Sequence, residues 1–88
     1  QPLGFIGFNE NHVEMLFVDP AHHRQGIGRA LLDFGRQSRS AMSVDVNEQN
    51  PQATAFYQRY GFVQTGRSPL DGEGRPFPLL HMSLPTRA

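Results

Sequence analysis

The sequence predicts an α/β (α+β) domain in which a mixed β-sheet carries two helices, in the order β-β-α-β-α-β-β. Three observations lead to this prediction: short segments with alternating apolar residues, two segments of helical periodicity among them, and turn residues at the boundaries. The 88 residues suffice for one small domain and not two, so the whole range 1–88 is assigned to it.

The first part of the chain is expected to form a β-hairpin. Residues 3–8 form a short apolar strand, and the turn residues 9–11 connect it to a second strand over 12–18, which ends at Asp19-Pro20. Side chains alternate across a strand, so the second strand should have two distinct faces. The expected faces hold Val13, Met15 and Phe17 on one side, and His12, Glu14, Leu16 and Val18 on the other.

A helix is expected to start at about Gly26 or Ile27 and to fade through the polar run 37–40. Residues 42–46 then form a third strand, in which apolar residues alternate with Ser43 and Asp45. Helical spacing groups four residues of the helix into one apolar stripe: Ile27, Ala30, Leu31 and Phe34.

The second helix has clear signals at both ends. Asn50 is a suitable N-cap, Pro51 fits the first helical position, and Gly61 is a suitable stop after the segment PQATAFYQRY. The remaining strands, over 62–65 and 79–84, form a closing hairpin around a long polar loop.

Composition limits the classes of function. The chain has no cysteine, which rules out disulfides and thiolate chemistry and is compatible with a cytoplasmic location. Its formal net charge is zero, so it lacks the overall basic field typical of nucleic-acid binding. No run approaches the roughly 20 apolar residues of a membrane span. We therefore expect no nucleic-acid and no membrane partner.

Two glycines at the start of the first helix suggest an anion site. Helix N-termini present unpaired N–H groups and a partial positive charge. Gly26 and Gly28 leave these groups accessible, and Arg24 and Arg29 add charge beside them, so a phosphate cradle is one reading and simple packing of the chain is the other. Known nucleotide fingerprints fail, because Leu31 occupies the third glycine position and no Gly-Lys pair exists.

The segment LFVDPAHHRQGIGRALL resembles the signature of the Gcn5-related N-acetyltransferase (GNAT) family. Leu16, Val18 and Pro20 fit the end of the family's strand, and Gly26 and Gly28 fit its glycine pair. The later segment NEQNPQATAFYQRYGFVQTGR resembles the family's second half, so the resemblance covers about residues 3 to 84. One departure is that a histidine, His23, stands where the family has Gln or Arg.

The resemblance implies that acetyl-CoA lies in a V-shaped gap between the strands 12–18 and 42–46, which splay apart. The pantetheine arm would pair with one strand's backbone like an added strand. Two of the implied cofactor contacts have another reading. Arg29, implied for the pyrophosphate, could be a solvated helix residue, and Asn50, implied for the CoA arm, could be only an N-cap. The implied cofactor-binding residues are Leu16, Phe17 and Val18 for the arm, His23, Arg24, Gln25, Gly26, Ile27, Gly28 and Arg29 for the pyrophosphate, and Asn50 and Phe56 in the second segment.

The resemblance also implies the chemistry. Tyr57 matches a family tyrosine near the thioester sulfur, where its hydroxyl can protonate the leaving thiolate, and this role is favoured over simple packing in the core. The base that takes the proton of the amine is His12 or Glu14, and these two stay open, with Glu14 also readable as a solvated residue. His81 is a further candidate. The pair His22-His23 does not predict a metal site, because adjacent histidines rarely converge on one ion.

The expected function is an acetyl-CoA-dependent N-acetyltransferase, or its cofactor-binding half, that acts on a small-molecule or peptide amine. Asp71 and Glu73 in the long loop hint at a cationic acceptor, although solvated loop charges explain them just as well. The family's usual N-terminal strand-helix segment is absent, so the fold would be a truncated one with an uncovered sheet edge. This favours a homodimer, with segment exchange as one way to form it. The alternative is a non-catalytic CoA-binding or structural module.

Overall fold

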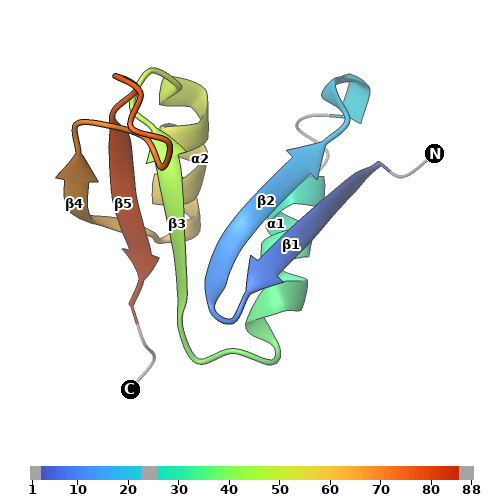
Figure 1. Ribbon diagram of the computed structural model, residues 1–88. Coiled ribbons are helices and arrows are strands. Elements are labelled where there is room, and N and C mark those ends of the chain that lie inside the picture. Colours follow the sequence, from blue (N-terminus) through green and yellow to red (C-terminus); the bar gives the residue numbers. More distant parts are fainter. Residues whose placement is uncertain (1–2, 23–25, 86–88) are drawn as a thin grey trace.

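The computed structural model describes residues 3–22 and 26–85. A five-stranded sheet has the strand order β1-β2-β3-β5-β4, and both helices cover the same face of it (Figure 1). The predicted fold class and element order are confirmed, and the largest boundary difference is that the fourth strand reaches Ser68. The elements are β1 (Gly4–Asn9), β2 (His12–Val18), a short 3-10 helix (Pro20–His22), α1 (Ile27–Arg36), β3 (Met42–Asn47), α2 (Pro51–Tyr60), β4 (Val63–Ser68) and β5 (Leu79–Leu84).

The two parallel strands in the middle of the sheet separate soon after they start. β2 pairs with β3 only at His12 opposite Ser43 and at Val13 opposite Val44. Beyond these pairs the strands diverge, and the gap between them widens toward their C-terminal ends (Figure 1). The molecule therefore has two halves, one made of β1, β2 and α1 and the other of β3, β5, β4 and α2.

A β-bulge in β2 makes the predicted faces of this strand wrong at His12 and Val13, whereas Met15 and Phe17 lie on the other face from Leu16 and Val18, as predicted. Phe8 of β1 pairs with Val13 and Gly7 pairs with Met15, so Glu14 is an extra residue without an opposite partner. The bulge turns Val13 onto the face of Leu16 and Val18, where it is buried, whereas Met15 is 55% exposed. Strict alternation fails here because the extra residue shifts the phase of the strand by one position.

The predicted apolar stripe of α1 is correct at Ile27 and Leu31, whose side chains approach Gly4 of β1, and wrong at Ala30 and Phe34, which are exposed. Leu32 is fully buried, whereas Phe34 is 68% exposed. The face toward the sheet contains Gly28, Leu31, Leu32 and Gly35, which follow the same helical spacing. Two of the four are glycines, which do not register as apolar residues in a sequence pattern, and this explains the error.

The core lies between the sheet and the helices. Tyr57 contacts the rings of Phe56 and Phe62 edge-on, with ring centroids 5.2 and 5.3 Å away. Neither helix of the described chain has the length and apolar character that a membrane crossing requires. The buried apolar residues are Val13, Leu32, Met42, Val44, Val46, Tyr57, Phe62, Leu80, Met82 and Leu84.

Gly35 allows α1 to pack closely on the hairpin. A Cβ atom at this position would lie 2.6 Å from Cε2 of Phe8, and the Arg39 guanidinium lies over the same ring, 3.6 Å from its centroid. We expect Gly35→Ala to lower the free energy of unfolding by about 1 kcal/mol, because overpacking of about 1–3 kcal/mol outweighs a helix-propensity gain of about 1. Urea unfolding measures the change.

Gly7→Ala is the matched control for this variant. A Cβ atom at Gly7 meets nothing within 4 Å, so its stability should stay close to that of the parent chain. A Gly35→Ala variant more stable than the parent would show that the Phe8 ring can move aside at little cost.

Candidate functional site

A cavity of about 310 Å³ opens where β2 and β3 diverge. Its walls come from the bulged part of β2, the second half of β3 and the first turns of α2. The lining residues are Val13, Glu14, Met15, Leu16, Val44, Asp45, Val46, Asn47, Asn50, Ala53 and Tyr57. The cavity thus brings together Tyr57, Glu14, Leu16 and Asn50, all of which are candidate residues from the sequence.

Tyr57 combines a buried ring with an accessible hydroxyl. The side chain is only 7% exposed and is fixed between Phe56 and Phe62. Within the described residues its hydroxyl makes no hydrogen bond, and no fully buried side-chain oxygen or nitrogen there lacks a partner, so the hydroxyl keeps contact with solvent. Burial raises the pKa of Tyr57. The phenol therefore stays protonated at neutral pH, which is the state that a proton donor requires.

Asn50 serves as the N-cap of α2 as the sequence predicts. Its Oδ1 atom accepts a hydrogen bond from the Ala53 backbone N–H at 3.1 Å. Because its side chain also lines the cavity, the side-chain amide N–H groups can still meet a ligand there. The structure is therefore compatible with Asn50 as an N-cap and also as a cofactor contact.

The two glycines at the start of α1 have different structural roles. Gly26 has a φ of +77°, a left-handed conformation that glycine adopts without strain, and a Cβ atom there would meet nothing within 4 Å. No side chain of the described residues caps this helix end, so its first N–H groups suit an anion. Gly28 instead allows close packing, since its Cβ atom would lie 3.0 Å from Cζ of Phe56.

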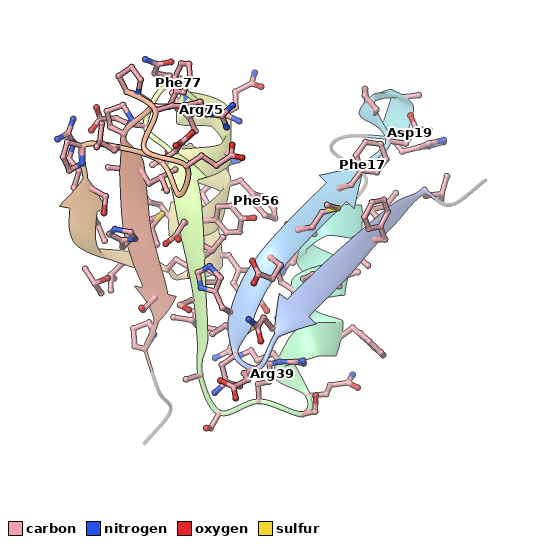
Figure 2. All side chains as sticks on the ribbon, viewed as in Figure 1. Phe17, Asp19, Arg39, Phe56, Arg75 and Phe77 are labelled. Atoms are coloured by element: carbon pink, nitrogen blue, oxygen red, sulfur yellow. The ribbon has the colours of Figure 1, made fainter. Side chains whose placement is uncertain are left out.

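Phe56 connects the two halves of the molecule behind the gap. Its ring reaches Gly28 on α1 and contacts Tyr57 on its own helix (Figure 2). Phe17 lies on the open face of the sheet and stacks on Phe5 with ring centroids 5.5 Å apart (Figure 2). The side chain of Phe17 thus points away from the helices, and any role in cofactor binding falls to its backbone.

Three of the candidate residues for the pyrophosphate, His23, Arg24 and Gln25, lie outside the described residues. Ile27 starts α1 and is half-buried, whereas Arg29 is exposed. The Arg29 guanidinium carbon lies 5.8 Å from the centre of the Tyr60 ring, on the flank of the helix. That contact supports the reading of Arg29 as a surface residue of the helix.

A cluster of polar side chains on the open face includes a residue that the sequence analysis did not single out, Asp45. Its Oδ1 atom lies 2.7 Å from Nδ1 of His81, and its Oδ2 atom lies 3.6 Å from Nε2 of His12. The alternation of buried Val44 and Val46 could have placed Asp45 on the other face of β3. Only the sheet order shows that His12 and His81 are its neighbours on either side.

The loop carboxylates are engaged with an arginine. Asp71 Oδ2 accepts from Nε of Arg75 at 2.8 Å, and Glu73 pairs with Nη2 of the same guanidinium at 2.5 Å. Hydrogen bonds from the Arg75 and Glu73 backbone lower the pKa of Asp71. The two carboxylates order the loop, and their pairing weakens the hint that they receive a cationic acceptor.

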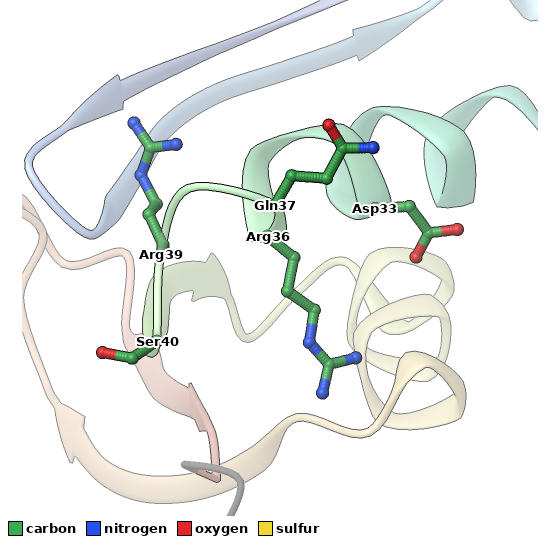
Figure 3. Close-up of a pocket in the computed structure, with 5 residues that line it drawn as sticks. All are labelled: Asp33, Arg36, Gln37, Arg39 and Ser40. Carbon is green, nitrogen blue, oxygen red and sulfur yellow. The ribbon is translucent and has the colours of Figure 1, made fainter.

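A second hollow, of about 350 Å³, lies at the C-terminal end of α1 (Figure 3). Arg39 points from it toward the β1–β2 turn, where its Nε donates to the Glu10 carbonyl at 2.9 Å (Figure 3). The other lining residues are Asp33, Arg36, Gln37 and Ser40, none of which is a candidate from the sequence. The described residues contain no group of His, Asp and Glu side chains that could hold a metal ion.

Comparison with known proteins gives a consistent result. The model of the acetyltransferase (GNAT) domain matches residues 1–84. The peptidyl-lysine N-acetyltransferase YjaB of Salmonella typhimurium is 41% identical over 85 residues, which are 97% of this chain and 59% of that protein. The solution structure of apo-form YjaB from Escherichia coli has a TM-score of 0.90 at 39% identity, and the match covers 99% of this chain and 59% of that one.

A more distant structure shares the fold. A putative streptothricin acetyltransferase from Bacillus anthracis, solved in complex with acetyl coenzyme A, has a TM-score of 0.86 at 23% identity. The match covers 97% of this chain and 56% of that one. The chain therefore spans less than two thirds of the length of these relatives.

Proposed function

Because the chain belongs to the GNAT acetyltransferase family, we propose that it binds acetyl-CoA in the gap between β2 and β3 and transfers the acetyl group to an amine. One observation carries the proposal. The two parallel strands lose their pairing after Val13, and Tyr57 lines the cavity that this divergence creates. Such a gap offers a strand edge to the pantetheine arm and a proton donor to the reacting sulfur.

The cofactor would use both ends of the gap. On β2, the backbone of Leu16, Phe17 and Val18 lies beyond the last pair with β3, which suits strand-like binding of the arm. At the start of α1, the N–H groups after Gly26 have no side-chain cap from the described residues and suit the pyrophosphate. The predicted residues His23, Arg24 and Gln25 precede this helix directly in the sequence and belong to the same proposed cradle.

The proposed reaction is direct transfer. The amine nitrogen attacks the thioester carbonyl carbon, the new C–N bond forms and the C–S bond breaks. Tyr57 gives its phenolic proton to the departing sulfur, and the amine proton goes to His12 or Glu14. The relatives named as peptidyl-lysine N-acetyltransferases favour a peptidyl-lysine amine as the acceptor class. A homodimer and a cytoplasmic location stay predictions from the sequence.

Isothermal titration calorimetry with acetyl-CoA and CoA tests the cofactor assignment. We expect one site per chain with a dissociation constant between about 1 μM and 1 mM, the range typical of enzyme substrates. Heat signals that are absent at millimolar cofactor would rule out both the transferase and the non-catalytic CoA-binding module. Binding without acetyl transfer to any amine would favour the non-catalytic module.

A further inference from the structure

A row of polar side chains crosses four strands on the open face of the sheet. His12 lies on β2, Asp45 on β3, His81 on β5 and Ser68 on β4. Asp45 and His81 are direct partners across the β3–β5 pair, and Asp45 is also in the wall of the cavity. The row therefore borders the cavity at Asp45 and ends at the edge of the sheet.

The hydrogen bonds hold Asp45 from one side. An ionised carboxylate only accepts, so the His81 Nδ1–H donates to Asp45 Oδ1 at 2.7 Å. In the neutral ring Nε2 then accepts from the Ser68 hydroxyl, at 2.6 Å. Both nitrogens of His81 are thus used within the protein, which fixes the ring and, through it, one oxygen of Asp45.

The other oxygen of Asp45 faces His12 without touching it. Asp45 Oδ2 and His12 Nε2 are 3.6 Å apart, too far for a hydrogen bond between them. Two atoms at this separation can both lie about 2.9 Å from one ammonium nitrogen placed between them. The ring of His12 is oriented by Ser43, whose Oγ lies 2.8 Å from Nδ1.

Asp45 differs from three other carboxylates of the described chain in its partners. Glu48 pairs with Arg67, and Asp71 and Glu73 both pair with Arg75. Asp45 pairs with two histidines instead, and its side chain is 38% exposed. Its negative charge is therefore open to a cation from outside the chain.

The geometry points to Asp45 as the residue that binds the acceptor ammonium, with His81 as its positioning residue and His12 as the proton acceptor. This inference rests on the proposed acetyl transfer and chooses His12 over Glu14. The ammonium proton passes to His12 Nε2, and the freed lone pair attacks the thioester carbonyl. The C–S bond breaks, the sulfur takes the Tyr57 proton, and the second proton of the attacking nitrogen passes through solvent to the Tyr57 phenolate, which leaves a neutral amide. For this step Nδ1–H of His12 donates to Ser43 Oγ, which leaves Nε2 free to accept.

Steady-state kinetics with acetyl-CoA and Nα-acetyl-lysine amide test the assignment. The chain contains no lysine, so every acetylated lysine formed belongs to the probe. We expect Asp45→Asn to raise KM for the amine at least tenfold, and His12→Asn to lower kcat by about 10². Asp33→Asn, the same substitution on the far side of the molecule in α1, is the matched control. An Asp45→Asn variant with an unchanged amine KM would overturn the proposal.

The role of His81 has its own test. His81→Gln keeps an amide that can donate to Asp45 and should retain most of the affinity for the amine, whereas His81→Leu should raise the amine KM. A purely structural role would instead lower stability in both variants and leave KM unchanged. Equal KM values for the glutamine and leucine variants would contradict positioning by His81.

A binding measurement decides the question if turnover is too slow to follow. We expect the lysine probe, added to the CoA-loaded chain, to shift the imidazole NMR signals of His12 and His81, and Asp45→Asn to abolish these shifts. Unchanged signals in a chain that still binds CoA would refute the acceptor site and leave the cofactor assignment intact. If the parent chain binds no CoA, the result contradicts the proposed function itself and not only the acceptor site.

Discussion

Tyr57→Phe is expected to lower the rate of acetyl transfer by about 10²–10⁴, the usual contribution of a general acid, and to leave CoA affinity within about twofold. The substitution removes only the hydroxyl, and the ring keeps its edge-on contacts with Phe56 and Phe62. Because that hydroxyl has no hydrogen-bond partner among the described residues, its loss leaves no protein group unsatisfied. The fold should therefore be kept while the chemistry is lost.

Tyr60→Phe is the matched control for this prediction. Tyr60 lies in the same helix, but its hydroxyl donates to Asp33 Oδ1 at 2.6 Å, outside the cavity. Its removal should cost about 1 kcal/mol of stability at most and leave the rate unchanged. Single-turnover kinetics with saturating acetyl-CoA measure both variants. Equal rates for Tyr57→Phe and the parent chain would show that another group, or water, protonates the thiolate.

Gly26→Asp is expected to weaken CoA binding at least tenfold relative to Gly26→Asn. Both side chains tolerate the left-handed backbone at this position, and both find open space there. The two variants therefore differ in charge alone. The aspartate places a negative charge at the helix end where the pyrophosphate is proposed to bind, and a tenfold loss corresponds to about 1.4 kcal/mol of repulsion.

Stability and affinity should move in opposite directions in this pair. An aspartate near a helix N-terminus is favourable for the helix, so Gly26→Asp should be at least as stable as Gly26→Asn in thermal unfolding. The difference in CoA affinity should shrink as salt is added, because exposed charges are screened. S-acetylpantetheine, which lacks the pyrophosphate, should bind both variants equally. Equal CoA affinities of the two variants at low salt would rule out a pyrophosphate site at the start of α1.

The parts of the fold that the sequence predicted well depend on local rules. Asn50 and Pro51 at one end and Gly61 at the other fix α2, and the structure confirms the N-cap hydrogen bond to Ala53. The Gly-Ile-Gly segment marks the start of α1 because only glycine adopts the backbone at Gly26 without strain. Caps and turns involve residues within a few positions of each other, so one sequence is enough to predict them.

The errors concern contacts between distant segments. The bulge at Glu14 is visible only once β1 and β2 are paired, because neither strand by itself shows which residue lacks a partner. The buried face of α1 includes Gly35, whose value is the room it leaves for Phe8, a residue from another element. A pattern that scores each residue by its own hydrophobicity assigns such a glycine no role.

The sequence by itself determined the order of the elements, the ends of both helices and the likeness to a family with an acetyl-CoA gap. Tertiary structure alone decided that Val13 is buried and that Tyr57 lines the cavity. It also decided that Asp45 lies between His12 and His81. The physical reason is the range of the interactions. Caps and periodicity act within a few residues along the chain, whereas the Asp45 cluster needs three strands brought side by side by the sheet order.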